Sequence, residues 1–292
     1  MRLLEREHEL TVLRAVVHGA QDGHGSGVGI AGDSGTGKSA LLEAVCSEVA
    51  GVRLLKGSCD PLSTPRPLGP FRDIARAVGL GPLVRDEDVR LTQLCEEVYE
   101  CLGSEPSVLV VEDLHWVDAA SVEVLRFLAR RLEAMPLALV VTYRDREVGA
   151  RHPARPLLGD VARLDSLTTL HLAPLSVDGV AALVADTDLA AETVHRVTQG
   201  NPFFVTEVAK EPDRPLPESV RDAVLARTTE VSPEDFEVLQ LVATAPDRLD
   251  DRVLSQLAVD LPTLRRLDRT GLLTRARGGL VFHHELARQA VE

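Results

Sequence analysis

The sequence predicts an α/β fold in which helices cover both faces of a parallel sheet, followed by a smaller and mainly helical region. Between residues 5 and 174, short apolar stretches alternate with helical patterns, which is typical of parallel three-layer sheets. A glycine-rich turn follows the first apolar stretch and leads directly into a helix. Ligands bind at the carboxyl ends of the strands in such folds, so functional residues are expected there.

The elements of the first region follow one another in a regular order. Residues 5–20 have helical periodicity, with Leu10, Leu13, Val16 and Val17 on one face. Further helices are expected at residues 40–50, 70–79, 87–102 and 118–131. A proline-rich loop is expected at residues 61–70. Strands are expected within residues 28–31, 52–60, 108–112, 136–147 and 168–175.

The glycine-rich turn has the spacing of a phosphate-binding loop (P-loop). Gly32, Gly37, Lys38 and Ser39 form the pattern Gly-x-x-x-x-Gly-Lys-Ser between a predicted strand and a predicted helix. Backbone N–H groups of such a loop surround phosphate oxygens, and the helix start adds its dipole. We expect the loop to bind ATP or ADP, with Lys38 reaching the β-phosphate and, in ATP, the γ-phosphate. Ser39 is expected to bind Mg²⁺. The motif predicts a P-loop NTPase fold. The residues predicted to contact the nucleotide are Gly32, Asp33, Ser34, Gly35, Thr36, Gly37, Lys38, Ser39 and Ala40.

A pair of carboxylates ends the apolar stretch at residues 108–112. A strand that ends in carboxylates near a P-loop holds Mg²⁺, so Glu112 and Asp113 are candidate metal ligands and catalytic residues beside Lys38. Because side chains alternate along a strand, the two are not expected to share one task. Which of them binds the metal and which orients the attacking water stays open.

Three polar or aromatic residues near the predicted strand ends need separate interpretation. Arg144 follows the next strand and is predicted to sense the γ-phosphate; the alternative is an exposed Arg in a turn. Asp118 is better placed as the N-cap of the following helix than as a catalytic residue. Trp116, the single Trp of the chain, is expected to be buried under that helix.

The composition is that of a globular protein with an acidic balance. Of 292 residues, 45% are hydrophobic, and the net charge of -13 argues against nucleic-acid binding by the whole chain. No uncharged apolar run reaches the ~18 residues of a membrane span, and the N-terminus is unlike a signal peptide. The four cysteines lack Cys-x-x-Cys spacing and are expected to be small buried residues of a cytoplasmic protein.

The region after the predicted sheet divides into two parts. A first domain is expected at residues 1–174, a small helical lid at 175–211, and a winged-helix domain at 212–292. In the last of these, helices near residues 217–229, 233–245, 250–257 and 261–270 precede two short β-like runs that meet at Gly278-Gly279, a hairpin signal.

The predicted winged helix carries a local positive charge. Residues 261–292 contain six Arg against two Glu and one Asp, so the helix at 261–270 is a candidate to enter a DNA groove. The alternative, which the overall acidity favours, is a packing module that clamps the nucleotide. His283 and His284 have no partners at zinc spacing, which argues against a metal there.

Eight segments occur in the order that one family shows. They are LEREHEL, GDSGTGKS, VVEDLHWVD, VVTYRDRE, LAPLS, GNPFFVTEV, LPESVRDAVLART and FHHELARQAV. Together they resemble the N-terminal ATPase module of large ATP-binding LuxR-family transcriptional regulators, which belong to the AAA-like signal-transduction ATPases with numerous domains (STAND). Related kinases, cyclases and antibiotic-pathway regulators carry similar modules. Glu112 departs from the common pattern, which has Asp first.

The resemblance implies further contacts and a larger parent protein. Pro202 would pack against the adenine, and His284 would reach the β-phosphate of bound ADP. The chain stops within a predicted helix, so we expect a fragment that a helical-repeat sensor and a helix-turn-helix domain follow. DNA binding and the response to an unknown inducer would then belong to the parent protein.

The resemblance also implies a function, a nucleotide-dependent switch with slow hydrolysis. ADP would hold a closed form, and exchange for ATP would allow self-association. The alternative is an AAA-type ring or DNA-loading ATPase that uses its winged helix on duplex DNA. A small-molecule kinase is a weaker third possibility, because no sequence feature marks an acceptor pocket.

Overall fold

The computed structural model describes residues 3–48, 50–60, 66–81, 91–214, 216–229, 231–245, 248–257, 259–276 and 278–292. The chain divides into two compact units, Met1–Ala173 and Pro174–Glu292. Among the described residues, none of the helices combines the length and apolar character that crossing a bilayer requires.

The first unit is built on a parallel sheet. Its five strands in the described residues are β1 (Ser26–Ala31), β2 (Arg53–Ser58), β3 (Ser107–Glu112), β4 (Leu137–Tyr143) and β5 (Leu167–His171). They run in the order β2-β3-β4-β1-β5, and all neighbours are parallel. This order places the ends of β1 and β3 on either side of the end of β4, which confirms the predicted fold class.

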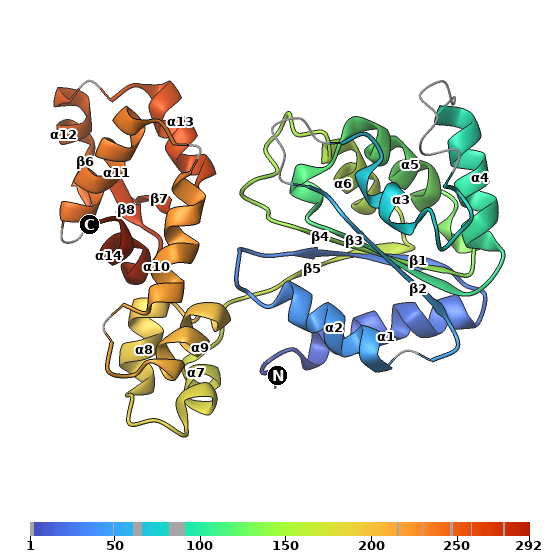
Figure 1. Ribbon diagram of the computed structural model, residues 1–292, viewed down its shortest axis with the longest axis horizontal. Coiled ribbons are helices and arrows are strands. Elements are labelled where there is room, and N and C mark those ends of the chain that lie inside the picture. The colour runs from blue at the N-terminus through green and yellow to red at the C-terminus, as the bar shows by residue number, and fades with distance from the viewer. Residues whose placement is uncertain are drawn as a thin grey trace. The chain divides into compact units, whose positions relative to one another are not determined.

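Helices cover both faces of this sheet (Figure 1). They are α1 (Glu7–Gln21), α2 (Lys38–Glu48), α3 (Gly69–Ile74), α4 (Leu91–Gly103), α5 (Ala119–Ala129) and α6 (Arg155–Val161). On β3, Val108 and Val110 pack with residues of α1 and α2, whereas Leu109 and Val111 pack with residues of α3 to α5. A strand buried on both faces is apolar throughout rather than alternating.

Most of the predicted elements of the first unit are present. The helix predicted at 70–79 is shorter, because α3 ends at Ile74 and the chain continues in turns. Residues 61–65 of the predicted proline-rich loop, and 87–90 of the next predicted helix, lie outside the described residues; α4 confirms the rest of that helix.

The second unit is mainly helical. Its helices are α7 (Val177–Val184), α8 (Ala191–Thr198), α9 (Pro202–Lys210), α10 (Glu218–Leu225), α11 (Pro233–Thr244), α12 (Asp251–Gln256), α13 (Leu261–Arg269) and α14 (Glu285–Val291). Side-chain N-caps fix where five of these helices begin; the capping residues are Ser176, Asn201, Ser232, Asp250 and Asp260.

A small antiparallel sheet completes the second unit. β6 (Leu249–Asp250), β8 (Gly279–Phe282) and β7 (Leu273–Ala276) pair in that order. The β7–β8 pair is the hairpin that the glycines predicted, and Gly278 has a φ of 83°. The division of this unit into a lid and a winged helix stays a prediction.

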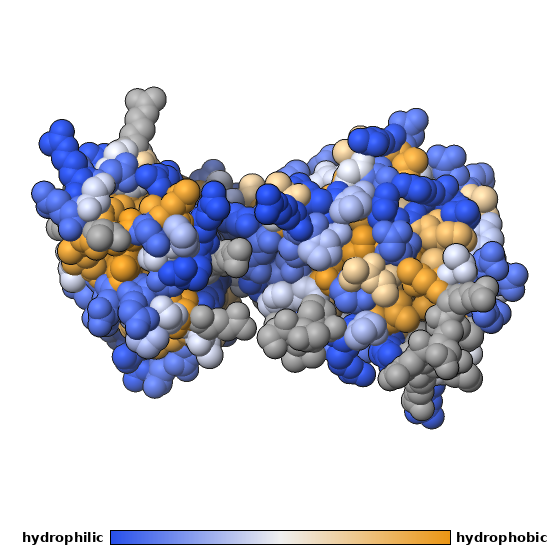
Figure 2. All heavy atoms as spheres, turned by 90° about the horizontal axis from the view of Figure 1, so that it is seen from above, coloured by the Kyte–Doolittle hydropathy of each residue, from blue (hydrophilic) through white to orange (hydrophobic). Residues whose placement is uncertain are grey.

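The surface carries both hydrophilic and apolar side chains. Hydrophilic side chains cover much of the face seen in Figure 2, with apolar side chains between them. The large apolar side chains most exposed among the described residues are Leu54, Val253, Leu257 and Leu261.

Candidate functional site

The phosphate loop joins β1 to α2, as the sequence predicts. Gly35 and Gly37 have φ angles of 82° and 94°, which glycine adopts without strain. At Gly32, an added Cβ would lie 2.8 Å from Oγ1 of Thr36, whose hydroxyl donates to the Asp33 carbonyl at 2.8 Å. The loop therefore requires glycine at these positions.

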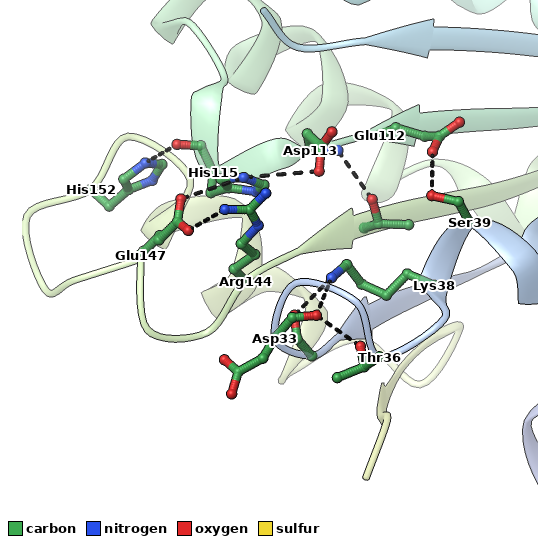
Figure 3. A network of polar contacts seen from close by, with 12 residues as sticks. Asp33, Thr36, Lys38, Ser39, Glu112, Asp113, His115, Arg144, Glu147 and His152 are labelled. Atoms are coloured by element: carbon green, nitrogen blue, oxygen red, sulfur yellow. Dashed lines mark hydrogen bonds and ion pairs between the residues drawn. The ribbon is translucent and has the colours of Figure 1, made fainter. Parts of the chain in front are cut away.

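The ammonium group of Lys38 points back into this loop (Figure 3). Its Nζ donates to the carbonyls of Gly32 at 2.8 Å and Asp33 at 2.9 Å. Burial, with a smaller contribution from the nearby guanidinium of Arg144, lowers the pKa of Lys38 to about 8. A desolvated cation inside a phosphate loop is suited to neutralising a phosphate group.

The two adjacent carboxylates take different directions. Glu112 ends β3, and its Oε2 accepts from Oγ of Ser39 at 3.4 Å. Asp113 has left the strand and adopts the left-handed conformation, with φ 57° and ψ 45°. Its backbone N–H donates to Oγ1 of Thr142 on β4 at 3.0 Å. Of these two adjacent carboxylates, Glu112 is therefore the one that is hydrogen bonded to Ser39.

Arg144 lies just beyond β4, beside the same edge of the sheet. Its Nη1 donates to Oε1 of Glu147 at 2.6 Å, and its guanidinium carbon lies 5.3 Å from the ring centroid of Trp116. Trp116 is half-buried against the core. The positive charge of Arg144 is close enough to Lys38 to lower the pKa of Lys38. The predicted cation thus lies near the phosphate loop.

His115 also belongs to the site, although it is not among the residues predicted from the sequence. Its side chain is 0% exposed, and its Nε2 lies 3.4 Å from Oε2 of Glu147 and 3.9 Å from Oδ1 of Asp113. Burial, followed by the charges of Arg144 and Lys38, lowers the pKa of His115 to about 3, so the ring is neutral near pH 7. The sequence feature that could have indicated His115 is a histidine in an otherwise apolar turn directly after the acidic strand end.

Two further arginines contact the phosphate loop. Arg6, which precedes α1 and is 5% exposed, donates to the carbonyls of Ala173 at 2.5 Å and Thr36 at 3.5 Å. Arg146 lies 3.6 Å from Oδ1 of Asp33. Neither was singled out from the sequence, because the loop carbonyls and carboxylate that they approach are distant along the chain.

Asp118 has the structural role that the sequence predicts. Its Oδ1 accepts from the backbone N–H of Ser121 at 3.0 Å, which caps α5. The same oxygen accepts from the backbone N–H of Leu68 at 3.1 Å. Through these bonds, Asp118 connects the start of α5 with the segment before α3.

Pro202 and His284 both lie in the second unit. Pro202 is the first residue of α9, and Asn201 caps that helix by accepting from Phe203 at 3.1 Å. The His284 ring is buried, with its centroid 5.1 Å from that of Phe204. The contacts expected of Pro202 with adenine and of His284 with a β-phosphate stay predictions.

The oxygen atoms at the strand end fit Mg²⁺ when a nucleotide supplies the remaining ligands. Ser39 and Glu112 are hydrogen bonded, with Asp113 next in the chain. Within the described ranges, no cluster of three or more His, Cys, Asp or Glu residues could hold a metal alone. Mg²⁺ is usually bound by one or two carboxylates together with substrate phosphates, and this donor set matches that pattern.

The sheet order, the phosphate loop and the acidic strand end give the first unit the fold of a P-loop NTPase. Residues 2–141 match the family model described as AAA ATPase domain. That match supports nucleotide binding and hydrolysis as the general activity.

One curated protein resembles the chain along nearly its whole length. An uncharacterized protein (R02095) of Rhizobium meliloti (strain 1021) is 26% identical over a 367-residue alignment. The alignment covers 99% of this chain and 35% of that protein, so the chain spans about a third of its relative.

Solved structures share the fold at low sequence identity. The Walker-type ATPase PABY2304 of Pyrococcus abyssi has a TM-score of 0.62 at 15% identity, covering 99% of this chain and 96% of its own. The Aeropyrum pernix ORC1 protein, solved in complex with DNA, has a TM-score of 0.52 at 17% identity, with coverages of 99% and 92%. The Cdc6p protein of Pyrobaculum aerophilum has a TM-score of 0.51 at 16% identity, with coverages of 99% and 94%.

Proposed function

We propose that this chain is an ATP- and ADP-binding regulatory switch with slow, Mg²⁺-dependent hydrolysis. The observation that carries the proposal is the convergence of the Lys38 ammonium, the Ser39–Glu112 pair and Arg144 at one edge of the sheet. The groups that meet there are of the kinds that bind phosphate, bind a metal ion and sense the charge of the terminal phosphate.

The geometry supports a separate role for each side chain. Lys38 neutralises the β- and γ-phosphates, and Ser39 with Glu112 holds Mg²⁺, which supplies positive charge to the phosphate oxygens when it is bound. Asp113, turned away from the strand, orients the attacking water by accepting its hydrogen bond. Arg144 stabilises the charge on the terminal phosphate as the bond to the leaving oxygen breaks.

The regulatory part of the proposal rests on the family resemblance. Pro202 contacts the adenine and His284 the β-phosphate of ADP, which holds a closed form. Exchange for ATP releases this form and allows self-association. DNA binding and inducer recognition belong to other parts of a longer cytoplasmic transcriptional regulator, consistent with the curated relative being longer than this chain.

The alternative is an AAA-type ATPase that loads onto DNA through the second unit. The fold likeness to the ORC1 protein and the exposed Arg265 and Arg275 favour it. Against it, these arginines border a largely apolar hollow of about 300 Å³, which suits protein packing better than phosphate contact. The hollow is lined by Leu261, Leu264, Arg265, Asp268, Leu273, Thr274, Arg275 and Leu280.

Nucleotide binding tests the proposal directly. We expect ADP and ATP to bind in the presence of Mg²⁺, and Lys38→Ala to weaken binding about 10- to 100-fold by removing a charge-assisted contact. The measurement is isothermal titration calorimetry, together with chromatography of any nucleotide released from the purified protein.

Lys56→Ala is the matched control, because Lys56 is exposed on β2. It should bind nucleotide like the wild type. Absence of binding to the wild type, or equal binding by Lys38→Ala, would refute the proposed function.

A further inference from the structure

We propose that His115 is a positioning residue, whose buried ring connects the Arg144–Glu147 ion pair to the carboxylate of Asp113. The phosphate-sensing cation and the water-orienting carboxylate would then be held by one side chain. The inference rests on the proposed function, because the roles of Arg144 and Asp113 come from it.

The contacts of the ring point to these two carboxylates. His115 Nε2 lies 3.4 Å from Glu147 and 3.9 Å from Asp113, on the side of the ring that faces both (Figure 3). Within the described part of the chain, neither ring nitrogen has a hydrogen-bond partner. A buried donor without a partner is costly, so a small approach of either carboxylate would be favoured.

The surroundings hold the backbone of His115 and pack against its ring. Ala154 donates its backbone N–H to Nδ1 of His152 at 3.1 Å, so Nε2 of His152 carries the proton. That Nε2 lies 2.9 Å from the carbonyl of His115 and donates to it. The ring centroid of Trp116 lies 4.4 Å from that of His115.

Glu147 links this ring to the cation. One oxygen of Glu147 accepts from Arg144 at 2.6 Å, while the other faces His115. A shift of Arg144 toward a phosphate would therefore take from Glu147 its cationic partner. Because the Nε2–H of His115 faces both Glu147 and Asp113, this change would also alter the interaction of His115 with Asp113. Supporting hydrogen bonds of this kind orient the groups that act on a substrate.

Three substitutions distinguish the role of the ring nitrogens of His115 from the role of its volume in packing. His115→Phe keeps an aromatic ring without nitrogen, His115→Gln places an amide near the Nε2 position, and His115→Asn places one near Nδ1. We expect His115→Phe and His115→Asn to lower kcat of ATP hydrolysis about 10- to 100-fold, with KM changed by less than about threefold. His115→Gln should recover most of the turnover.

A spectroscopic measurement tests the same inference without turnover. Long-range ¹H–¹⁵N correlation spectra of ¹⁵N-histidine-labelled protein report which ring nitrogen carries the proton, and the signal missing in His115→Gln assigns the residue. We expect the Nε2–H form. The Nδ1–H form would overturn the proposal.

The remaining outcomes distinguish this inference from the proposed function. If the wild type neither binds nor hydrolyses nucleotide, the proposed function fails. If it hydrolyses ATP and His115→Phe does so equally well, or His115→Asn outperforms His115→Gln, only the positioning role fails. The exposed His8 provides the control His8→Phe, which should behave like the wild type. If His115→Phe unfolds, the Gln and Asn variants decide the outcome.

Discussion

At the scale of single residues, backbone conformation separates two carboxylates that are neighbours in the chain. Glu112 still belongs to β3 and faces Ser39. Asp113 lies in the left-handed region and turns toward His115. A non-glycine residue in that region is uncommon, and the bonds of Asp113 to Thr142 and Trp116 support it here.

The separation predicts different defects for two isosteric substitutions. Glu112→Gln should remove most of the Mg²⁺ dependence of ATP binding, because it deletes a charged metal ligand. Asp113→Asn should keep Mg²⁺-dependent binding and lower hydrolysis about 10²- to 10⁴-fold, the range of general acid–base catalysis. Calorimetry with and without EDTA and steady-state turnover measure the two effects. The reverse pattern would exchange the two roles.

At the scale of elements, the site arises from strands that are neighbours in the sheet rather than in the chain. The apolar stretches and the glycine-rich turn predict the strands, the P-loop and its helix, because burial on both faces and phosphate binding impose strong local patterns. They do not give the strand order. Without it, Glu147 after β4 cannot be placed beside His115 after β3.

The second unit contains an ion pair that also joins two elements distant from each other in the sequence. Arg266 on α13 donates to the carboxylate of Asp235 on α11 at 2.5 and 2.9 Å, and the Asp235 side chain is 4% exposed. Removing Arg266 leaves this carboxylate buried without its cation. Arg266→Ala should therefore lower the free energy of unfolding, and by more than Arg275→Ala does. Arg275→Ala, which breaks a more exposed pair with Asp251, should cost less than about 1 kcal/mol.

The same pair predicts an acid dependence. The Arg266 guanidinium holds the pKa of Asp235 below its ordinary value of 3.8. The stabilisation is complete at pH values above that ordinary value and is lost as pH falls through the lower pKa of the folded protein. Unfolding followed by circular dichroism between pH 7 and pH 2 should show a smaller acid-induced loss in Arg266→Ala than in the wild type. Equal losses would show that other carboxylates dominate.

At the scale of the whole molecule, the acidic charge opposes the self-association that the switch requires. Each chain carries a net charge of -13, so two chains repel each other at low ionic strength. Salt at about 0.15 M shortens the range of this repulsion to about 8 Å. Association driven by ATP should therefore be stronger at physiological salt than at low salt, whereas DNA binding through arginines weakens as salt increases.

Light scattering after size-exclusion chromatography distinguishes these two dependences. With ADP we expect a mass near 31.6 kDa at both salt concentrations, and with a non-hydrolysable ATP analogue a larger mass, more so at 0.15 M salt. Lys38→Ala should show no nucleotide-dependent change. If the analogue leaves the mass unchanged while the protein binds duplex DNA with an affinity that falls with salt, the DNA-loading alternative replaces the switch. A nucleotide-dependent assembly without DNA affinity favours the switch, because an acidic chain has then overcome its own repulsion through contacts that only the ATP form provides.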